Sequence, residues 1–372
     1  MKKYLAIIFI CGWLSPKIFI GGFNVGVQDI SAILLLVFNY KINKKIVKIF
    51  YADLVFAFIL FFLGFFYLSK LDIEGFLIGC RTLLFVFAVL SFTSFSYHHL
   101  HYILKVVLFI IFTFVSVSVI RIILNLLFNP FDAINFFYGS DSFRVKSPFE
   151  PEGAASSQVP VGYMIALILC LPTVLKSKYK RTIFMLGAIG TTSRASILSI
   201  AVVYFRNINY KKISIFFSLL ILTLLLYLIF LKSFLSNDGQ LDGSASKRLE
   251  LYSNSISIMF SNPSSLFIGF GLSSKLLEAG TGEGFYESFV INSFMQGGVI
   301  MLLCSLWILI KSFYYDFRYN IFSISIVIFF GNIIGGSNYF SMFAYPLMGL
   351  IISLAVKKQN NISFENSASN DI

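Results

Sequence analysis

Apolar runs of about 15–25 residues recur along the whole chain, and they constrain its fold more than any other feature. A helix of this length is what crossing the hydrocarbon core of a bilayer requires. Hydrophobic residues make up 58% of the 372 positions and charged residues 12%, with a mean hydropathy of +0.85. A soluble domain cannot bury so large an apolar fraction. The sequence therefore predicts an all-α polytopic membrane protein.

The number of spans depends on how one short segment is interpreted. Segment 182–205 is long enough for one full crossing, or for two short half-helices that meet at Ser193. With two half-helices, most lysines and both termini lie on the cytoplasmic side, as the positive-inside rule requires. We therefore expect about 12 transmembrane helices, within a range of about 10–12. The candidate spans are 4–20, 24–40, 50–69, 75–97, 102–128, 158–175, 182–192, 194–205, 213–231, 286–310, 320–336 and 339–356.

Residues 1–356 are expected to form a single transmembrane domain with two large outer loops, 129–157 and 232–285. The second loop is the longest interruption of the apolar sequence, but it contains short apolar pieces of its own. We therefore expect a large, partly ordered periplasmic loop that packs back on the protein. The polar residues 357–372 predict a disordered cytoplasmic tail.

The net charge of +12 does not indicate nucleic-acid binding, because the basic residues lie at the ends of apolar runs, where they set membrane topology. All four cysteines lie inside apolar runs and none has metal-ligand spacing, so we expect small core residues. They are Cys11, Cys80, Cys170 and Cys304. No metal or other cofactor is predicted.

Several arginines do not follow the lysines to the cytoplasmic side. An arginine within a span costs about 2.5–3.5 kcal/mol on insertion, so it needs a partner or a role. It can reach outer headgroups or pair with an outer carboxylate. Alternatively, the arginines line an outward-facing cavity for an anionic ligand, because a guanidinium binds phosphate through two parallel hydrogen bonds. The carboxylates considered are Asp132, Asp141, Glu150 and Glu152. The outer arginines are Arg81, Arg121, Arg144, Arg194 and Arg248.

The segment Thr191-Thr192-Ser193-Arg194-Ala195-Ser196 favours the anion-binding interpretation. Hydroxyl residues before a helix start form N-caps, and this helix would begin at the outer face. Its free backbone N–H groups, its positive dipole end and Arg194 would then meet at one place. The alternative is an ordinary cap beside an interfacial arginine.

Three motifs together resemble the O-antigen polymerase and ligase superfamily of bacterial inner membranes. The first is Thr-x-Ser-Arg-Ala at 191–195. The second is Arg248-x-x-x-Tyr252, followed by Asn262-Pro263 and Gly269-Phe270-Gly271. The third is Glu287-Ser288 followed by Gly297-Gly298 in a span. The resemblance covers roughly residues 130–310 and rests on the order and spacing of short motifs.

The resemblance implies a glycosyltransferase-C-like fold that acts on glycans carried by undecaprenyl diphosphate at the periplasmic face. It implies neither nucleotide sugars nor an essential metal. Ligases of this superfamily typically carry a histidine followed by asparagine near the position of Glu287-Ser288, so this sequence is more similar to a Wzy-type polymerase of O-antigen or capsule. Membrane lipid, a chain-length regulator and a flippase are the other expected partners.

A glycosyl transfer from a lipid diphosphate needs cations for the departing diphosphate and a base for the acceptor hydroxyl. The catalytic candidates are Arg194, Arg248 and Glu287, although Glu287 could equally cap the helix that begins near Tyr286. The other outer carboxylates are Glu150, Glu152, Glu250 and Glu283. The substrate-binding candidates are Arg81, Arg121, Arg144, Ser193, Tyr252 and Tyr286, of which the aromatic residues could equally belong to the interfacial belt.

Two other functions remain open at this point. One is an O-antigen ligase. The other is a 12-span transporter or lipid-linked glycan flippase, which would place ionisable residues and Gly or Pro breaks near the midplane in matching halves of the chain. The sequence shows no internal repeat, and its non-cytoplasmic arginines collect at one face, which favours the enzyme.

Overall fold

The computed structural model describes residues 1–20, 23–39, 48–69, 71–128, 158–191, 243–282, 288–319 and 344–369, together with residues 328 and 340. This part of the chain is mostly helical. Four of its helices are long and apolar enough to cross a membrane, namely Lys48–Leu68, Ile73–Ser94, Tyr97–Phe128 and Phe289–Phe313. The finding agrees with a helical membrane protein. The count of about 12 spans stays a prediction, because 194–205 and 213–231 lie outside the described residues.

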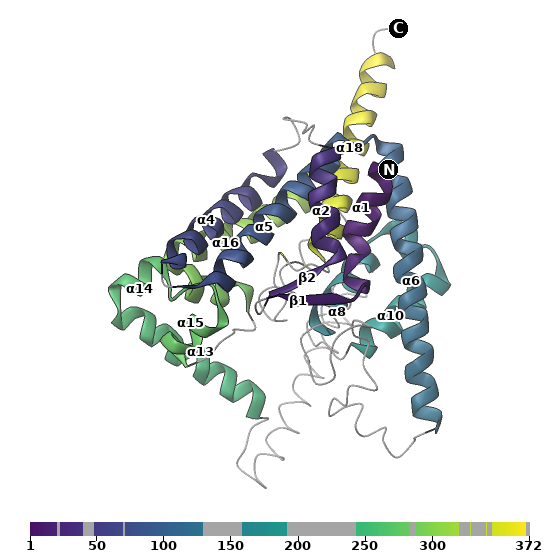
Figure 1. Ribbon diagram of the computed structural model, residues 1–372. Coiled ribbons are helices and arrows are strands. Elements are labelled where there is room, and N and C mark those ends of the chain that lie inside the picture. Colours follow the sequence, from purple (N-terminus) through teal and green to yellow (C-terminus); the bar gives the residue numbers. More distant parts are fainter. Residues whose placement is uncertain are drawn as a thin grey trace, which may run out of the picture.

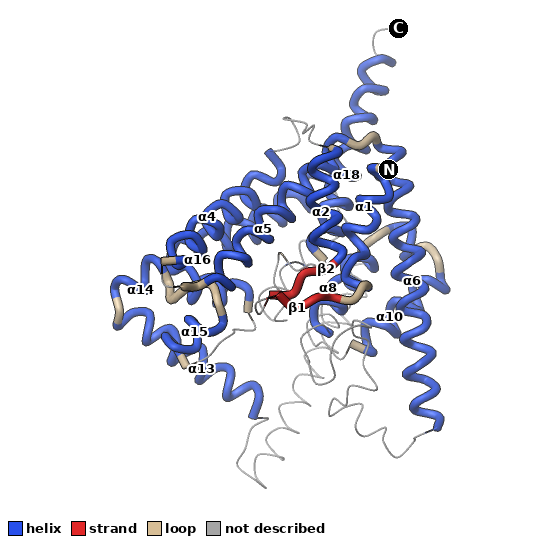
Figure 2. Tube along the Cα trace, viewed as in Figure 1, coloured by secondary structure: helices blue, strands red, loops and turns tan. Residues whose placement is uncertain are grey.

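A short β-hairpin takes the place of the end of the first expected span (Figure 2). Helix α1 (Lys2–Cys11) and the 3-10 turn η1 (Gly12–Leu14) precede β1 (Lys17–Ile20) and β2 (Phe23–Gly26), which pair antiparallel with Lys17 opposite Gly26. The expected continuous helix over 4–20 is therefore absent. Pro16 disfavours helix continuation, and the Gly-Gly pair at 21–22 separates two apolar pieces in the sequence, a pattern typical of a hairpin.

Helices α2 (Val27–Phe38), α4 (Tyr51–Leu68) and α5 (Ile73–Ser91) follow, and α5 ends in the 3-10 turn η3 (Phe92–Ser94). Helices α4 and α5 run side by side and approach closely at two glycines (Figure 1). A Cβ atom on Gly64 would lie 3.0 Å from the backbone of α5, and one on Gly79 would lie 2.9 Å from the backbone of α4. Small residues at such contacts allow membrane helices to pack backbone to backbone.

The other side of the bundle is built on the long helix α6 (Tyr97–Phe128), which contacts α1, α10 (Lys178–Gly190) and α18 (Tyr345–Ser369). The expected span 158–175 is divided into α8 (Gln158–Leu169) and α9 (Pro172–Leu175), because Pro172 cannot continue the α8 hydrogen bonds. Helix α18 continues to Ser369, beyond the start of the tail that the sequence predicts to be disordered. Both termini lie at one end of the bundle, here called the terminal end (Figure 1).

Helix α16 (Phe289–Tyr319) crosses behind α4 and carries a lysine into the protein core. The Nζ atom of Lys311 lies 2.9 Å from Oδ2 of Asp53 on α4, with side-chain exposures of 9% and 0%. The Tyr345 phenol, at the start of α18, interacts with the same carboxylate. The sequence places Lys311 in a loop and Asp53 at a span boundary, whereas in the structure their ion pair connects two helices that are far apart in the chain.

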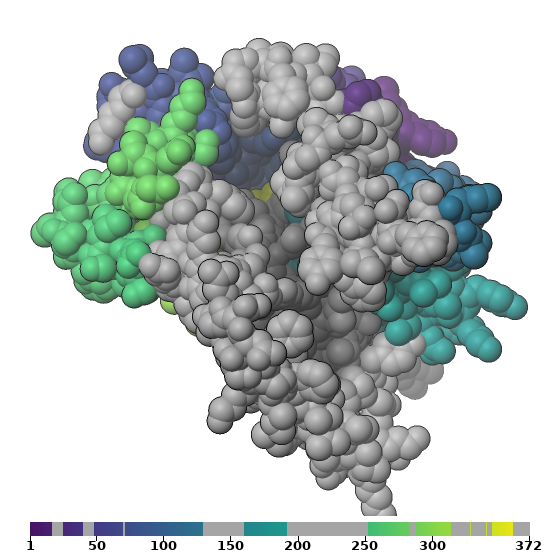
Figure 3. Space-filling model, turned by 90° about the horizontal axis from the view of Figure 1, so that it is seen from below, coloured from purple at the N-terminus to yellow at the C-terminus, as the bar shows by residue number. Residues whose placement is uncertain are grey.

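At the far end of the bundle, opposite the termini, lie three helices of segment 232–285, which the sequence predicts to be the second outer loop: α13 (Gly243–Ser261), α14 (Pro263–Ile268) and α15 (Ser274–Thr281). Seen from that end, their green surface lies on the opposite side from the blue and teal surfaces of α6 and α10 (Figure 3). Helices α13 and α14 contact α16. This arrangement brings two of the motifs noted in the sequence into one region.

Candidate functional site

The glycine motif at 269–271 is fixed to the far end of the bundle by hydrogen bonds. The N–H of Phe270 donates to the Met295 carbonyl at 2.9 Å, and the N–H of Gly271 donates to the Gln296 carbonyl at 3.3 Å. The Gln296 side-chain amide returns a hydrogen bond of 3.0 Å to the Leu272 carbonyl. Segment 269–272 therefore pairs with α16 immediately before Gly297-Gly298.

Glycine is required on both sides of this junction. Gly269 has φ +80° and Gly298 has φ +65°, in the region that residues with a side chain rarely adopt. A Cβ atom on Gly269 would lie 2.3 Å from the Gln296 backbone, and one on Gly298 would lie 2.4 Å from the Phe267 backbone. The helical dihedral angles of α16 are interrupted at Gly297 and Gly298. The second and third sequence motifs therefore meet as one tightly packed junction, here called the glycine junction.

The bundle contacts the glycine junction from α4 and α5 as well. The buried hydroxyl of Tyr67, at the end of α4, donates to the Gly269 carbonyl at 2.9 Å. Asp72 caps the start of α5 by accepting the Gly75 N–H at 2.9 Å, and a Cβ atom on Gly75 would lie 3.0 Å from Cβ of Leu272. The position of the loop helices is thus set by three separate membrane helices.

Among the sequence-predicted site residues, Tyr252 lies within this region. It is half-buried on α13 and packs against a small apolar cluster formed by Met259, Leu277, Phe294 and Met295. Arg248 lies on α13, four residues before Tyr252, so that the two positions fall on one face of the helix. Arg144, Ser193, Arg194, Tyr286 and Glu287 lie outside the described residues.

Arg81 forms a bidentate ion pair with Asp29, which lies near the start of the expected span 24–40. Its Nε lies 2.7 Å from Asp29 Oδ1, and its Nη2 lies 2.6 Å from Asp29 Oδ2. Asp29 also accepts the Gly26 N–H at 2.9 Å, which ties the hairpin to α2. The two side chains are 17% and 10% exposed. None of the carboxylates considered from the sequence is this partner.

This pairing bears on what Arg81 can do chemically. A diphosphate ligand would have to bind the part of the guanidinium away from Asp29, or displace the carboxylate from its paired donors. The sequence places Asp29 and Arg81 at similar depths, a few residues inside the expected spans 24–40 and 75–97, but it does not show that they pair. Arg121 is exposed on the distal half of α6. Its assignment, like that of Arg81, to substrate binding stays a prediction.

Tyr67, Asp72 and Gln296 cannot be predicted as part of this region, because nothing in their local sequence distinguishes them from other polar residues near span ends. Tyr67 and Gln296 are identified by their hydrogen bonds to segment 269–272, and Asp72 by capping the turn whose Gly75 packs against Leu272. Within the described ranges, no three His, Cys, Asp or Glu side chains form a group that could hold a metal ion.

A search against protein-family models found no match, and a search of curated proteins found no similar sequence.

Proposed function

We propose that this protein is a membrane glycosyltransferase of the Wzy type, which polymerises lipid-linked oligosaccharide repeat units of an O-antigen or capsule. In this proposal it moves a growing glycan from undecaprenyl diphosphate to the non-reducing end of an acceptor repeat unit. The bond between the sugar and the diphosphate breaks, a glycosidic bond to the acceptor hydroxyl forms, and the acceptor proton passes to a base. Arginines stabilise the charge that develops on the departing diphosphate.

The observation that carries the proposal is the glycine junction. It joins Gly269-Phe270-Gly271 to Gly297-Gly298, two motifs on which the resemblance to the polymerase and ligase superfamily rests. The junction holds α13, with Arg248 and Tyr252, against the ends of apolar helices. A lipid-linked substrate needs such an arrangement, because its diphosphate lies at the membrane surface while its polyprenyl chain stays in the hydrocarbon core.

In this proposal Arg194 and Arg248 bind the diphosphate and Glu287 accepts the proton of the acceptor hydroxyl. Arg81, Arg121, Arg144, Ser193, Tyr252 and Tyr286 bind the remainder of the lipid-linked glycan. The enzyme works in the inner membrane with its active face in the periplasm, in a glycosyltransferase-C-like fold. A flippase would supply its substrate and a chain-length regulator would act with it.

Deletion of the gene tests the proposal directly. We expect cells that carry single repeat units on their surface lipid and no polymer, because ligation and export would continue without polymerisation. Surface lipid with no repeat unit at all would contradict the polymerase and would instead indicate a ligase or a flippase. Complementation with the intact gene controls for effects on neighbouring genes.

A further inference from the structure

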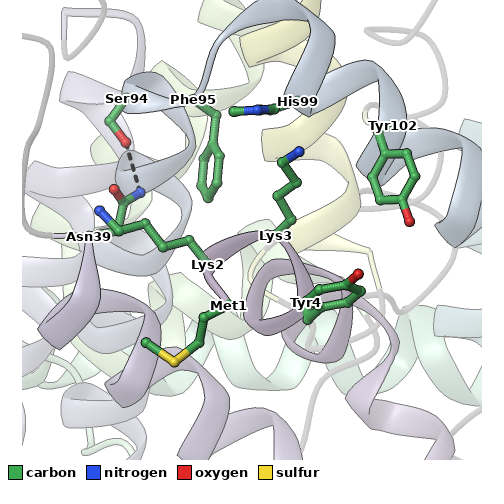
Figure 4. Close-up of a pocket in the computed structure, with 9 residues that line it drawn as sticks. All are labelled: Met1, Lys2, Lys3, Tyr4, Asn39, Ser94, Phe95, His99 and Tyr102. Carbon is green, nitrogen blue, oxygen red and sulfur yellow. Dashed lines mark hydrogen bonds between the residues drawn. The ribbon is translucent and has the colours of Figure 1, made fainter.

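A pocket of about 600 Å³ opens at the terminal end of the bundle, where α1 and α6 begin and η3 ends (Figure 4). Its polar lining comes from three separate parts of the chain. Lys2, Lys3 and Tyr4 come from α1, Asn39 follows α2, and Ser94, His99 and Tyr102 come from η3 and α6. The pocket is therefore built by the packing of helices and does not belong to a single loop.

The lining of this pocket, here called the basic pocket, carries positive charge without acidic residues. Lys2 and Lys3 contribute two ammonium groups, and none of the 9 lining residues is Asp or Glu. In Figure 4 the Lys3 side chain extends toward His99, while Lys2 extends the opposite way, toward Asn39. The Lys3 Nζ also lies 5.6 Å from the centre of the Tyr102 ring. Lys3 and His99 can therefore donate hydrogen bonds to the same anion, and Lys2 adds a second positive charge to the lining.

Hydrogen bonds from other helical segments fix one wall of the basic pocket. The side-chain amide of the buried Asn39 donates to the Ser91 carbonyl at 3.0 Å and to the Ser94 hydroxyl at 2.7 Å. Lys357 of α18 donates from Nζ to the Phe95 carbonyl, and burial lowers the pKa of this lysine. The backbone of 91–95 is therefore fixed by two other helical segments, which preforms the pocket.

The position of the basic pocket relative to the membrane indicates which kind of anion it binds. Helix α6 and the helix that ends at Ser94 are both long and apolar enough to cross a membrane, and the pocket lies between an end of each. The ends of crossing helices lie at the level of the lipid headgroups. Phe95, Tyr4 and Tyr102 add aromatic surface, which is favourable at this level.

We propose that the basic pocket binds the phosphate group of an anionic membrane lipid. The Lys3 ammonium group and His99 contact the phosphate, Lys2 adds attraction for its charge, and the aromatic side chains contact the glycerol and the first part of the acyl chains. The site lies at the end of the bundle opposite the glycine junction, and it does not depend on the proposed polymerase activity. Loss of either one would leave the other unaffected.

Native mass spectrometry of the full-length protein in neutral detergent can count bound lipids. We expect short-chain phosphatidylglycerol to bind at least about tenfold more tightly than short-chain phosphatidylcholine, because each lysine near a membrane surface adds attraction for anionic lipid. The variant Lys2→Gln/Lys3→Gln should weaken phosphatidylglycerol binding about tenfold or more. The control Lys176→Gln/Lys178→Gln removes the same charge from exposed residues that do not line the pocket and should leave binding unchanged.

A second pair of variants leaves the N-terminal lysines in place. His99→Glu adds a carboxylate to the pocket lining, whereas His98→Glu adds it to a neighbouring exposed residue outside the lining. Both are surface changes on α6 that should fold normally. We expect only His99→Glu to reduce phosphatidylglycerol binding. Equal binding by these two variants would overturn the proposal, as would equal affinity for the two lipids.

Competition with soluble phosphate compounds tests whether the basic pocket binds a soluble phosphate compound and not a lipid. Inorganic phosphate and glycerol 3-phosphate should not displace phosphatidylglycerol when present at equal concentration, because they lack the acyl chains. Displacement by either compound would contradict a lipid ligand and would identify the basic pocket as a site for a soluble phosphate.

Discussion

Two aspartates, Asp29 and Asp53, pair with cations that lie inside apolar helices. Arg81 and Lys311 each approach a carboxylate from a different helix, at 2.6 Å and 2.9 Å respectively. The periodicity of the sequence places all four residues within or beside spans, but pairing across 52 residues or more depends on how the helices pack. These pairs therefore belong to the part of the structure that local pattern cannot specify.

Removal of one partner from the Asp53–Lys311 pair should lower the stability of the folded protein strongly. Asp53→Asn leaves the Lys311 ammonium buried without its counter-charge, and we expect a loss of about 3–5 kcal/mol in stability. The double variant Asp53→Leu/Lys311→Met removes both charges and should lose much less. Thermal unfolding of the purified proteins in detergent measures the difference. If the double variant were no more stable than the single one, the ion pair would not be the reason for the loss.

Substitution of the proposed catalytic arginines should remove activity without changing the amount of protein in the membrane. Arg194→Ala and Arg248→Ala should each abolish extension of a lipid-linked repeat, because the departing diphosphate loses its stabilising charge. Arg194→Lys should restore extension only in part, since lysine keeps the charge but not the planar pair of donors. The assay uses purified protein in liposomes, and the amount of inserted protein is the control. Normal extension by both alanine variants would exclude the anion site.

Substitution of Glu287 tests whether this residue accepts a proton during the reaction or only caps a helix. If it accepts the acceptor proton, Glu287→Gln should lower the rate of extension by about 10²–10⁴ while donor binding remains. If it only caps a helix, the same change should cost on the order of 1 kcal/mol in stability with near-normal turnover. Rate and stability measured on the same preparation separate these outcomes. If Glu287→Gln had near-normal turnover while Glu150→Gln or Glu152→Gln lost extension, the base would lie in the expected first outer loop instead.

At the scale of elements, the glycine junction explains why the segment between two apolar regions of the chain, 243–282, can be ordered without a domain of its own. Four small contacts contribute to it: the Tyr67 hydroxyl, two backbone hydrogen bonds to 295–296 and the Gln296 amide. The apolar cluster around Met259 and Met295 adds burial on the same side. The helices α13–α15 are thereby fixed to the membrane helices through α16.

Two glycines with nearly equal φ but different surroundings test this explanation. A Cβ atom on Gly269 (φ +80°) would lie 2.3 Å from the Gln296 backbone, whereas one on Gly282 (φ +81°) would have nothing within 4 Å. Gly282→Ala should therefore cost only the backbone strain, on the order of 1 kcal/mol. Gly269→Ala should in addition separate segment 269–272 from α16. Limited proteolysis should then cleave within 243–282 at least about tenfold faster in Gly269→Ala, since access follows local opening.

Similar proteolysis of these two variants would contradict a tightly packed junction. Both variants place alanine at a positive φ, but only Gly269→Ala also places a methyl group against the backbone of α16. The ψ angle is -170° at Gly269 and -2° at Gly282, so Gly269→Ala also carries the larger backbone strain.

Sequence pattern predicts the long helices well, because α4, α5, α6 and α16 each contain a continuous apolar window. It fails where composition is apolar but the backbone is not helical, as in the β-hairpin after Pro16. The motifs at 269–271 and 297–298 are visible in the sequence, but their contact is not, because the residues that join them, Tyr67 and Gln296, look ordinary in isolation. The arginine and glutamate candidates of 192–242 and 283–287 stay predictions.

At the scale of the whole molecule, the two ends of the bundle differ in chemistry. The terminal end carries the basic pocket, with Lys2, Lys3 and His99, and lies near the half-buried Lys357, which donates to the Phe95 carbonyl. The far end carries the glycine junction, with neutral polar groups and α13–α15. The positive-inside rule assigns the lysine-rich end to the cytoplasm, which would place α13–α15 outside.

Cysteine labelling tests this orientation on intact cells. In a background that lacks Cys11, Cys80, Cys170 and Cys304, single cysteines would be placed at Ser253 on α13 and at Lys178 on α10, both of which are exposed. A membrane-impermeant thiol reagent should label the Ser253 variant without permeabilisation and the Lys178 variant only after it.

A cysteine at Asn209 should behave as the one at Lys178 does if segment 182–205 forms two half-helices, because the chain then returns to the cytoplasm. Labelling of Asn209 from outside, with Ser253 and Lys178 as expected, would reject the two half-helices. Labelling of Ser253 only after permeabilisation would place the glycine junction in the cytoplasm, where no lipid-linked repeat could be polymerised at the periplasmic face.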